Sequence, residues 1–573
     1  MSVKNTNQIT TVLFGGAAGD GIKEAGISLG KLFCKAGQEV FISSDYPSLI
    51  RGGHNFCRVS FAPEKVANDR SELDIAVAFN EETAKLHQGE LKKAGILILD
   101  GDKKNAGKIF YLPMSELVKK AGAPSMIMRT AVALGALCYY FFCPLKDLEK
   151  IFTAAFKDKA AKNILLARQG FKHAAENNWP ALKIPVSKKS AKRLIDGNQA
   201  FAEGFVDAGL EAYIAYPMTP ATSILHFLAS NKSKFNIRVV QPENEIAAAT
   251  MALGAAYAGK RTAVGTSGGG FALMQEAFSL AGITEIPFVA AISQRPGPAT
   301  GVPTGTAQAD LAMLKNAGHG EFPLVVLAPG DADESYEAGR EALNLAWQFQ
   351  IPVLVLLDKH LSESIVTADF KNNKKIIKGN VLTKVNKPSR PAGRESKEYK
   401  RYQFSASGIS PLAFPGTKNA AVKVNSYEHD EFGIMTEDKA LVKKMVGKRF
   451  KKMPLIAREV KKYQPLKIYG DKRAPNAVIF WGSTKGAVLE AVKIISQPIK
   501  AIQVFCLEPF PSAALARELR QAKKIIAVEG NVTGQLAALI REKTGIEIKH
   551  KILQYDSKPF NPMELAKKLN KLL

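Results

Sequence analysis

Residues 216–220 read YPMTP, and three further motifs follow along the chain: QPENEIAAA at 241–249, GTSGGG at 265–270 and SQRPGPATGVPTGTAQAD at 293–310. Each motif comes directly after a short apolar run that predicts a β-strand, and helical patterns separate the strands. Such alternation predicts a mostly parallel sheet with helices on its faces. Because ligands bind at the carboxyl edge of open parallel sheets, we expect the four motifs to form one site for an anionic substrate.

The same alternation extends over the whole chain, whose 573 residues are enough for several domains. We predict the fold class α/β, with three domains of mostly parallel sheets. The first occupies 1–184 and begins with the strand QITTVLFGG, the second occupies 194–365 around the four motifs, and the third occupies 471–573. Residues 366–470 begin polar and rich in lysine and proline, so we expect a crossing arm and an irregular segment there.

Composition narrows the classes of function. There are 79 Lys and Arg against 53 Asp and Glu, and the net charge of +26 suits phosphate-bearing ligands, small carboxylates or an acidic protein partner. A generally lysine-rich surface would explain the same charge, because the lysines are scattered. We find no nucleic-acid recognition motif and no basic stripe interleaved with aromatic residues, so we expect no nucleic-acid partner.

Cysteine spacing and hydropathy exclude two further kinds of site. The cysteines are too dispersed for iron–sulfur or zinc ligation, so we expect no metal on this chain and any electron-transfer cluster on another. The longest apolar run, AVALGALCYYFFCPL, is shorter than the roughly 20 residues that span a bilayer. The amino terminus lacks a signal-peptide pattern. We therefore expect a cytoplasmic protein with no membrane partner. The five cysteines are Cys34, Cys57, Cys138, Cys143 and Cys506.

Two acids open the helix that follows QP at 241–242. Glu243 and Glu245 lie in its first turn, and the alanines at 248, 249, 252 and 256 then share one face at helical spacing. A carboxyl group beside such an apolar face is desolvated and can share a proton with a heterocyclic nitrogen. The alternative is that both acids only stabilise the helix N-terminus.

The remaining motifs offer hydroxyls and one guanidinium. Thr266 and Ser267 end a strand at a glycine-rich turn, where free backbone N–H groups can also meet a ligand. Arg295 closes a strand before a Pro/Gly turn and can clamp a small carboxylate, although a surface arginine would look the same. Thr219, presented between two prolines after Tyr216, can bind a carboxylate or simply cap the next helix.

With these motifs the chain resembles the α subunits of the 2-oxoacid:ferredoxin oxidoreductases, in particular the 2-oxoglutarate synthase type with a γ-like domain fused ahead of α. The resemblance covers nearly the whole length. Beyond the four motifs its markers are GGAAGDG at 15–21, YPSLIRGGHN at 46–55, GISPLAFPG at 408–416, EHDEFG at 428–433, WGSTKGAVLEA at 481–491 and EGNVTGQLA at 529–537.

The resemblance implies that the three domains are a γ-like domain, a pyrimidine-binding domain for thiamine diphosphate and a transketolase C-terminal-like domain. It implies coenzyme A-dependent oxidative decarboxylation of a 2-oxoacid to an acyl-CoA and carbon dioxide, with reduction of ferredoxin. The expected substrate is 2-oxoglutarate. Glu245 matches the glutamate that engages the aminopyrimidine ring, with Glu243 as the fallback. Thr219 and Arg295 fall where the family binds the substrate carboxylate. Tyr216, Thr266 and Ser267 are then expected to line the cofactor.

The resemblance also divides the site between two chains in a heterodimer or heterotetramer. Thiamine diphosphate would be shared with a β subunit that carries Mg²⁺ and a [4Fe–4S] cluster. Coenzyme A would contact the first domain, where Gly16, Gly19, Gly21 and Arg51 are the expected contacts. Two alternatives stay open. One is a self-contained non-redox thiamine diphosphate enzyme, against which the missing diphosphate motif argues, and the other is a non-catalytic scaffold that binds nucleotide or coenzyme A.

Overall fold

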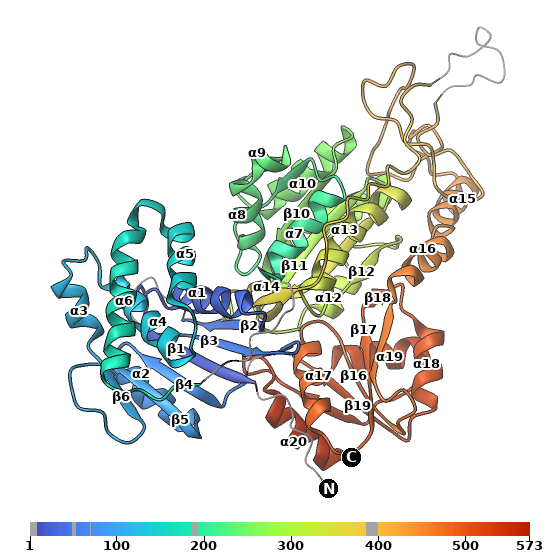
Figure 1. The fold of residues 1–573 in the computed structure, drawn as a ribbon. Coiled ribbons are helices and arrows are strands. Elements are labelled where there is room, and N and C mark those ends of the chain that lie inside the picture. Colours follow the sequence, from blue (N-terminus) through green and yellow to red (C-terminus); the bar gives the residue numbers. More distant parts are fainter. Residues whose placement is uncertain (1–8, 48–52, 69, 183, 185–191, 386–398) are drawn as a thin grey trace. The chain divides into compact units, whose positions relative to one another are not determined.

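The computed structural model describes residues 9–47, 53–68, 70–182, 184, 192–385 and 399–573 (Figure 1). The chain divides into two compact units. The first unit runs to Asp196 and adds Glu363–Asp369 and Asn561–Leu565, and the second comprises the other residues. Residues 185–191, between the first two predicted domains, and residues 386–398 of the predicted arm lie outside the described residues.

The first unit is built on an eight-stranded sheet with the order β6-β5-β4-β1-β3-β2-β14-β7. Strand β1 pairs in parallel with β4, but it pairs antiparallel with β3, which is also antiparallel to β2. The connection 46–53 between β2 and β3 is shorter than the dozen or so residues that a parallel crossover needs. The sheet is therefore mixed. Its strands are β1 (Thr10–Ala17), β2 (Glu39–Asp45), β3 (His54–Ala62), β4 (Leu73–Ala78), β5 (Leu91–Asp100), β6 (Ile109–Leu112), β7 (Arg193–Asp196) and β14 (Ile365–Ala368).

Alternate side chains of this sheet enter two separate cores. Val12 and Phe14 of β1 pack with the cluster that includes α1, α3, α4, α5 and α6, whereas Leu13 packs with the cluster that includes α2. Successive residues of a strand point to opposite faces, which explains the division. The helices are α1 (Ile22–Lys35), α2 (Glu81–His87), α3 (Met114–Lys120), α4 (Arg129–Tyr140), α5 (Leu145–Phe156) and α6 (Ala160–Glu176).

The second unit begins with a seven-stranded sheet of the order β18-β12-β13-β11-β10-β8-β9, in which only the edge pair β12–β18 is antiparallel. Core residues of α10 and α11 pack with one face, and those of α7, α8 and α13 with the other. The strands are β8 (Ala212–Ile214), β9 (Arg238–Val240), β10 (Thr262–Thr266), β11 (Phe288–Gln294), β12 (Val325–Leu327), β13 (Pro352–Asp358) and β18 (Cys506–Glu508). The helices are α7 (Gly197–Asp207), α8 (Thr222–Ser230), α9 (Lys232–Phe235), α10 (Glu245–Tyr257), α11 (Gly268–Thr284), α12 (Leu311–Lys315), α13 (Ala332–Phe349) and α14 (Lys359–Glu363).

A five-stranded sheet of the order β15-β17-β16-β19-β20 forms the C-terminal α/β domain. Its pairs are parallel except at the edge strand β15, which lies before residue 471. Most neighbouring strands in the three sheets are parallel, which confirms the predicted fold class. The strands are β15 (Leu466–Gly470), β16 (Asn476–Phe480), β17 (Ile499–Val504), β19 (Lys524–Glu529) and β20 (His550–Leu553). The helices are α17 (Thr484–Ile494), α18 (Ser512–Arg520), α19 (Gln535–Thr544) and α20 (Pro562–Leu572).

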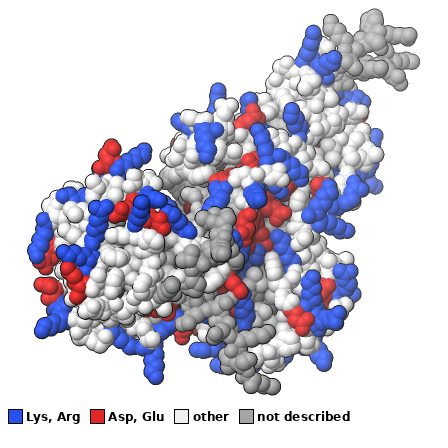
Figure 2. Space-filling model, viewed as in Figure 1, with Lys and Arg blue, Asp and Glu red and all other residues white. Residues whose placement is uncertain are grey.

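Three features of composition can be located in the structure. Lys and Arg side chains are scattered over the visible surface with Asp and Glu among them (Figure 2). The five cysteines are buried and unpaired, and among the described residues no group of His, Cys, Asp and Glu is arranged to hold a metal ion. No helix in the described ranges is long and apolar enough to cross a membrane.

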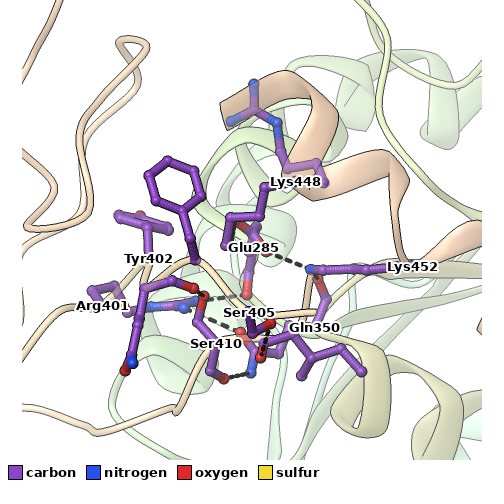
Figure 3. A network of polar contacts seen from close by, with 12 residues as sticks. Glu285, Gln350, Arg401, Tyr402, Ser405, Ser410, Lys448 and Lys452 are labelled. Atoms are coloured by element: carbon purple, nitrogen blue, oxygen red, sulfur yellow. Dashed lines mark hydrogen bonds and ion pairs between the residues drawn. The ribbon is translucent and has the colours of Figure 1, made fainter. Parts of the chain in front are cut away.

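The segment between the two α/β domains of the second unit is anchored by a buried charge cluster (Figure 3). Its regular helices in the described part are α15 (Lys439–Phe450) and α16 (Met453–Val460). The carboxylate of Glu285, at the C-terminus of α11, accepts a hydrogen bond from Nζ of Lys448 at 2.7 Å and also forms an ion pair with Lys452. Arg401 donates to the backbone carbonyls of Thr284 and Glu285 at 3.1 and 2.7 Å. Cations belong at a helix C-terminus, where the carbonyls carry partial negative charge.

The cluster shifts the ionisation of its own members. Burial raises the pKa of Glu285, but Lys448, Lys452 and Arg401 outweigh burial and hold that pKa far below its usual value. Burial lowers the pKa of Lys452 to about 8 despite the carboxylate beside it. The side chains of Glu285, Lys448 and Lys452 are each 1% exposed, so this charge balance is decided inside the protein rather than by solvent.

We predict that Glu285→Gln destabilises the second unit by about 3–5 kcal/mol at neutral pH, because two lysines stay buried without their carboxylate. The folded-state pKa of Glu285 is depressed, so its contribution is present above its unfolded value of 4.5 and is lost as pH falls below it. The difference from wild type should therefore shrink in acid. Urea unfolding at pH 7 and pH 4 measures both effects. Glu547→Gln, which removes one half of the exposed pair with Arg541, is the control. An equal, small effect of both variants would contradict the prediction.

Candidate active site

All four sequence motifs lie at one edge of the seven-stranded sheet. Strands β8, β9, β10 and β11 run parallel and are neighbours, so their carboxyl ends point the same way. The segment 216–220 follows β8, 241–245 follows β9, Thr266 ends β10, and Arg295 follows β11. The edge therefore assembles groups that are far apart in sequence, as parallel strand ends do.

Glu245 is the first residue of α10 and is 3% exposed. The helix is capped by Asn244, whose Oδ1 accepts the N–H of Ala247 at 2.9 Å, so the Glu245 carboxyl group is not used as the cap. Its Oε1 atom is buried and makes no hydrogen bond to any described residue. Glu243 precedes the cap and is exposed. Of the two acids, only Glu245 is turned into the protein.

Glu245 and the hydroxyl of Thr266 both lie against Gly270, in the first turn of α11. A Cβ on Gly270 would lie 2.0 Å from Thr266 Oγ1 and 2.7 Å from Glu245 Oε1, so only glycine fits between them. Ser267 occupies the N-cap position of α11 without using its side chain for the cap. The hydroxyls of Thr266 and Ser267 are both fully buried and without partners among the described residues.

A second carboxyl group, Asp310, lies at the same turn. Its carboxylate atoms are 2.3–2.7 Å from the position that a Cβ on Gly268 would take. Its Oδ2 atom is buried and has no partner among the described residues, and burial raises the pKa of Asp310 to about 6. Four buried oxygens, from Glu245, Thr266, Ser267 and Asp310, thus gather around one helix turn with unused hydrogen-bonding capacity.

Arg295 and Thr219 are in direct contact. Arg295 Nη1 donates to the backbone carbonyl of Thr219 at 2.8 Å, and the guanidinium is half-buried, which lowers the pKa of Arg295. Within the described ranges, Nε and Nη2 of Arg295 make no hydrogen bond. One edge of the guanidinium is therefore fixed while the other donors remain available. Tyr216, from the same turn as Thr219, is 37% exposed.

The glycine-rich turn of the first unit is partly filled by its own aspartate. Asp20 Oδ2 accepts the N–H of Ala17 at 3.0 Å and lies 2.7 Å from a Cβ built on Gly16, while Oδ1 pairs with Arg129. Gly19 has φ +98° with open space around it, and Gly21, with φ +76°, precedes α1. The open part of the turn is therefore at Gly19, whereas a Cβ on Gly21 would lie 2.9 Å from a methyl group of Ile127. Arg51, the other expected contact, lies outside the described residues.

Sequence analysis missed Asp310 as a site residue. Asp310 directly precedes the short helix α12, so in sequence it looks like an ordinary N-cap. The side chain of Asp310 makes no capping hydrogen bond, however. Only the approach of Gly268, from a different motif, reveals that the carboxyl group belongs to the site.

Models of protein families match most of the chain. One described as "Pyruvate ferredoxin/flavodoxin oxidoreductase" matches residues 11–173, and one described as "Pyruvate flavodoxin/ferredoxin oxidoreductase, thiamine diP-bdg" matches residues 203–448. The second match contains all four motifs and the four buried oxygens at the first turn of α11. Fold and site together define an oxidoreductase of the thiamine diphosphate-binding class.

Individual relatives have more specific names than the family models. The 2-oxoacid:ferredoxin oxidoreductase subunit alpha of Saccharolobus solfataricus is 32% identical, over 96% of this chain and 95% of its own. The 2-oxoglutarate oxidoreductase subunit KorA of Mycobacterium tuberculosis is 29% identical, over 94% and 87%. The 2-oxoglutarate:ferredoxin oxidoreductase from Magnetococcus marinus, solved with 2-oxoglutarate, coenzyme A and succinyl-CoA bound, matches with a TM-score of 0.87 and 30% identity over 98% and 99%. The chain belongs to the family of 2-oxoacid:ferredoxin oxidoreductase α subunits.

This result confirms the resemblance inferred from the motifs. It also confirms the oxidoreductase class with ferredoxin as acceptor, and thiamine diphosphate as the cofactor of the family's domain. The two alternatives, a self-contained non-redox enzyme and a non-catalytic scaffold, receive no support from the relatives.

We predict that Asp310→Asn stabilises the isolated chain at pH 8 by on the order of 1–3 kcal/mol, because it removes a buried carboxylate without a partner. The folded-state pKa of about 6 lies above the unfolded value of 3.8. Wild-type stability should therefore fall as pH rises from about 4 to 6, and the gain of the variant should vanish below pH 4. Thermal unfolding at pH 4 and pH 8 tests this, with exposed Glu437→Gln as control. A gain of equal size at both pH values would refute it.

Proposed function

We propose that this chain supplies the aminopyrimidine half of a thiamine diphosphate site and binds 2-oxoglutarate beside it. The overall reaction is the coenzyme A-dependent oxidative decarboxylation of the oxoacid to an acyl-CoA and carbon dioxide, with reduction of ferredoxin, in the cytoplasm. The proposal rests on one observation above all: four buried oxygens without partners surround the first turn of α11. Native proteins rarely leave such atoms unpaired unless a ligand satisfies them.

The chemistry of these groups fits the aminopyrimidine ring. A heterocycle with an exocyclic amino group offers both donors and acceptors, and a carboxyl group and two hydroxyls can satisfy both. Glu245 holds or shares a proton at a ring nitrogen, and the hydroxyls of Thr266 and Ser267 orient the ring edge. The buried alanines of α10, such as Ala248 and Ala249, keep water away from that proton. When bound, thiamine diphosphate supplies the carbon nucleophile for the 2-oxo group.

The oxoacid is held by the free edge of Arg295. Because Nη1 is fixed by the carbonyl of Thr219, the remaining donors of the guanidinium are oriented before substrate arrives. The hydroxyl of Thr219 is a further donor for the same carboxylate. The choice of 2-oxoglutarate is supported by the Magnetococcus marinus enzyme, which was solved with that oxoacid. Coenzyme A, also present in that structure, would contact the first unit at the open turn around Gly19.

A β subunit completes the site with Mg²⁺, the diphosphate contacts and the [4Fe–4S] cluster that passes electrons to ferredoxin. The outer face of α10 and α11 is its docking surface. Ile246, Met251 and Leu273 are 52%, 43% and 51% exposed, and Gly254 beside them meets nothing within 4 Å. Helices that are apolar on their outer face as well as their inner face are covered in the assembled protein. The same two helices carry Glu245 and Gly270, so the partner would cover the cofactor.

We predict that Glu245→Gln lowers the activity of the complex with its β partner by at least about 100-fold, the scale expected for loss of a proton-transfer group. Glu243→Gln is the matched control, since that acid lies two positions away and is exposed, and it should stay within about twofold. Calorimetric titration of thiamine diphosphate provides the second readout. Similar losses in both variants would rule out the assignment of Glu245.

We predict that the double variant Met251→Asp/Leu273→Asp weakens binding of the β partner by at least about 100-fold, because two buried interface side chains become charged. Its free chain should remain folded, since both positions are exposed. Size-exclusion chromatography and light scattering of the mixed subunits measure the effect. Leu165→Asp, a substitution of equal exposure on α6 of the first unit, should leave the complex intact. A stable complex of the double variant would disprove this docking surface.

A further inference from the structure

Gln308, in the loop that follows Arg295, is held entirely by the C-terminal α/β domain. It is 2% exposed, and all four of its polar groups are bonded. Its N–H donates to Gly530 O at 2.7 Å, and its Oε1 accepts the Gly530 N–H at 2.8 Å. Its Nε2 donates to Trp481 O at 2.8 Å, and its carbonyl accepts Nδ2 of Asn531 at 3.1 Å. Both polar atoms of this side chain are thus bonded to the C-terminal domain.

Two glycines, Gly482 and Gly530, line the space that the side chain of Gln308 occupies. Gly482 has φ +57°, and a Cβ there would lie 2.7 Å from Gln308 Nε2. A Cβ on Gly530 would lie 3.3 Å from Gln308 Cγ, which is tighter than ordinary contact. The motifs WGST at 481–484 and EGN at 529–531 thus form a slot that fits the side chain of Gln308.

Glu529 makes that slot rigid. It is fully buried, and its carboxylate accepts the N–H groups of Leu536 and Ala537 at the start of α19 at 2.7 and 3.0 Å. The same carboxylate accepts a hydrogen bond from Nδ2 of Asn531 at 3.0 Å. It therefore orients the amide that donates to the backbone carbonyl of Gln308. A buried, fully bonded carboxylate at a helix N-terminus is a fixed point in the domain.

Residues on both sides of Gln308, from 306 to 312, are also held by hydrogen bonds. Thr306 donates its N–H to Ser557 O at 3.0 Å, and Gln535 bridges Ala309 O and Ala312 N at 2.7 and 3.0 Å. Asp310 donates its N–H to Oε1 of Gln294, the residue before Arg295, at 3.1 Å. The bonds of Gln308 therefore reach the arginine through Asp310 and Gln294.

We infer that Gln308 is a positioning residue for the 2-oxoacid: by locking the returning limb of the loop 296–310 to the C-terminal domain, it fixes the direction of Arg295. The inference rests on the proposed function, in which Arg295 binds the substrate carboxylate. A clamp oriented before binding loses less freedom when substrate arrives, so a loosened loop should weaken oxoacid binding in particular.

The test compares two buried glutamines in the complex of the full chain with its β partner. Gln308→Met keeps the volume but removes both side-chain bonds. Gln503→Met is the matched control: Gln503 is also fully buried and loses bonds to Glu334 and Tyr469, far from the loop in sequence and in its contacts. Both variants should lose thermal stability. Only Gln308→Met should raise KM for 2-oxoglutarate, by about tenfold, while KM for coenzyme A stays within about twofold.

A KM for 2-oxoglutarate in Gln308→Met within twofold of the control would overturn the inference. If Gln308→Met does not fold, Gln535→Ala decides in its place. That change removes only the half-buried bridge to Ala309 and Ala312, and it should raise the same KM about threefold. An unchanged KM in that variant would equally overturn the inference. Arg295→Ala is measured separately: if its KM for 2-oxoglutarate is normal, the substrate role in the proposed function fails, whatever Gln308 shows.

Discussion

The first turn of α11 can form only because two of its positions have no side chain. Oxygens of Asp310 stand within 2.7 Å of a Cβ on Gly268, and those of Thr266 and Glu245 stand equally close to one on Gly270. Each buried oxygen without a partner costs about 1–3 kcal/mol. The surrounding core of α10, α11 and the sheet offsets that cost, so the site is organised before a ligand arrives. A ligand that satisfies these oxygens regains the cost as binding free energy and stabilises the fold.

The two ends of α11 are complementary in charge. Carboxyl groups and hydroxyls surround the N-terminus, where backbone N–H groups carry partial positive charge. At the other end, Arg401, Lys448 and Lys452 surround the C-terminus together with Glu285. At the N-terminus burial overrides the dipole, since the pKa of Asp310 is raised, whereas at the C-terminus three cations override burial. One helix thus connects the cofactor side of the unit to the irregular segment that follows the sheet.

Sequence reasoning worked where a pattern is local and failed where a pairing is distant. The strands β8, β9, β10 and β11, which precede the four motifs, follow from short apolar runs, so they were predicted from the sequence. The helix after them was predicted too, but it begins at Glu245 and does not include Glu243 in its first turn. Two features have no local pattern in the sequence. One is the addition of β14 to the first sheet, and the other is the hydrogen bond between Gly530 and Gln308, which are 222 positions apart. Asp310 was missed for the same reason, because its partner glycine belongs to another motif. The motifs WGST and EGN were recognised as markers, but their role as a slot depends on a residue from a different domain.

Under the proposed function, the charge of the α11 turn explains why this chain would hold only half of the site. The four groups that gather there are carboxyl groups and hydroxyls, and none of them is cationic. A polar heterocycle can bind among them, but they offer a diphosphate no cation, and a buried anion needs a charged partner. Arg295 is already directed by Thr219 and, in the proposed function, binds the oxoacid. On that proposal the diphosphate is held by cations from another surface, and the exposed apolar face of α10 and α11 is where a chain that carries them would approach.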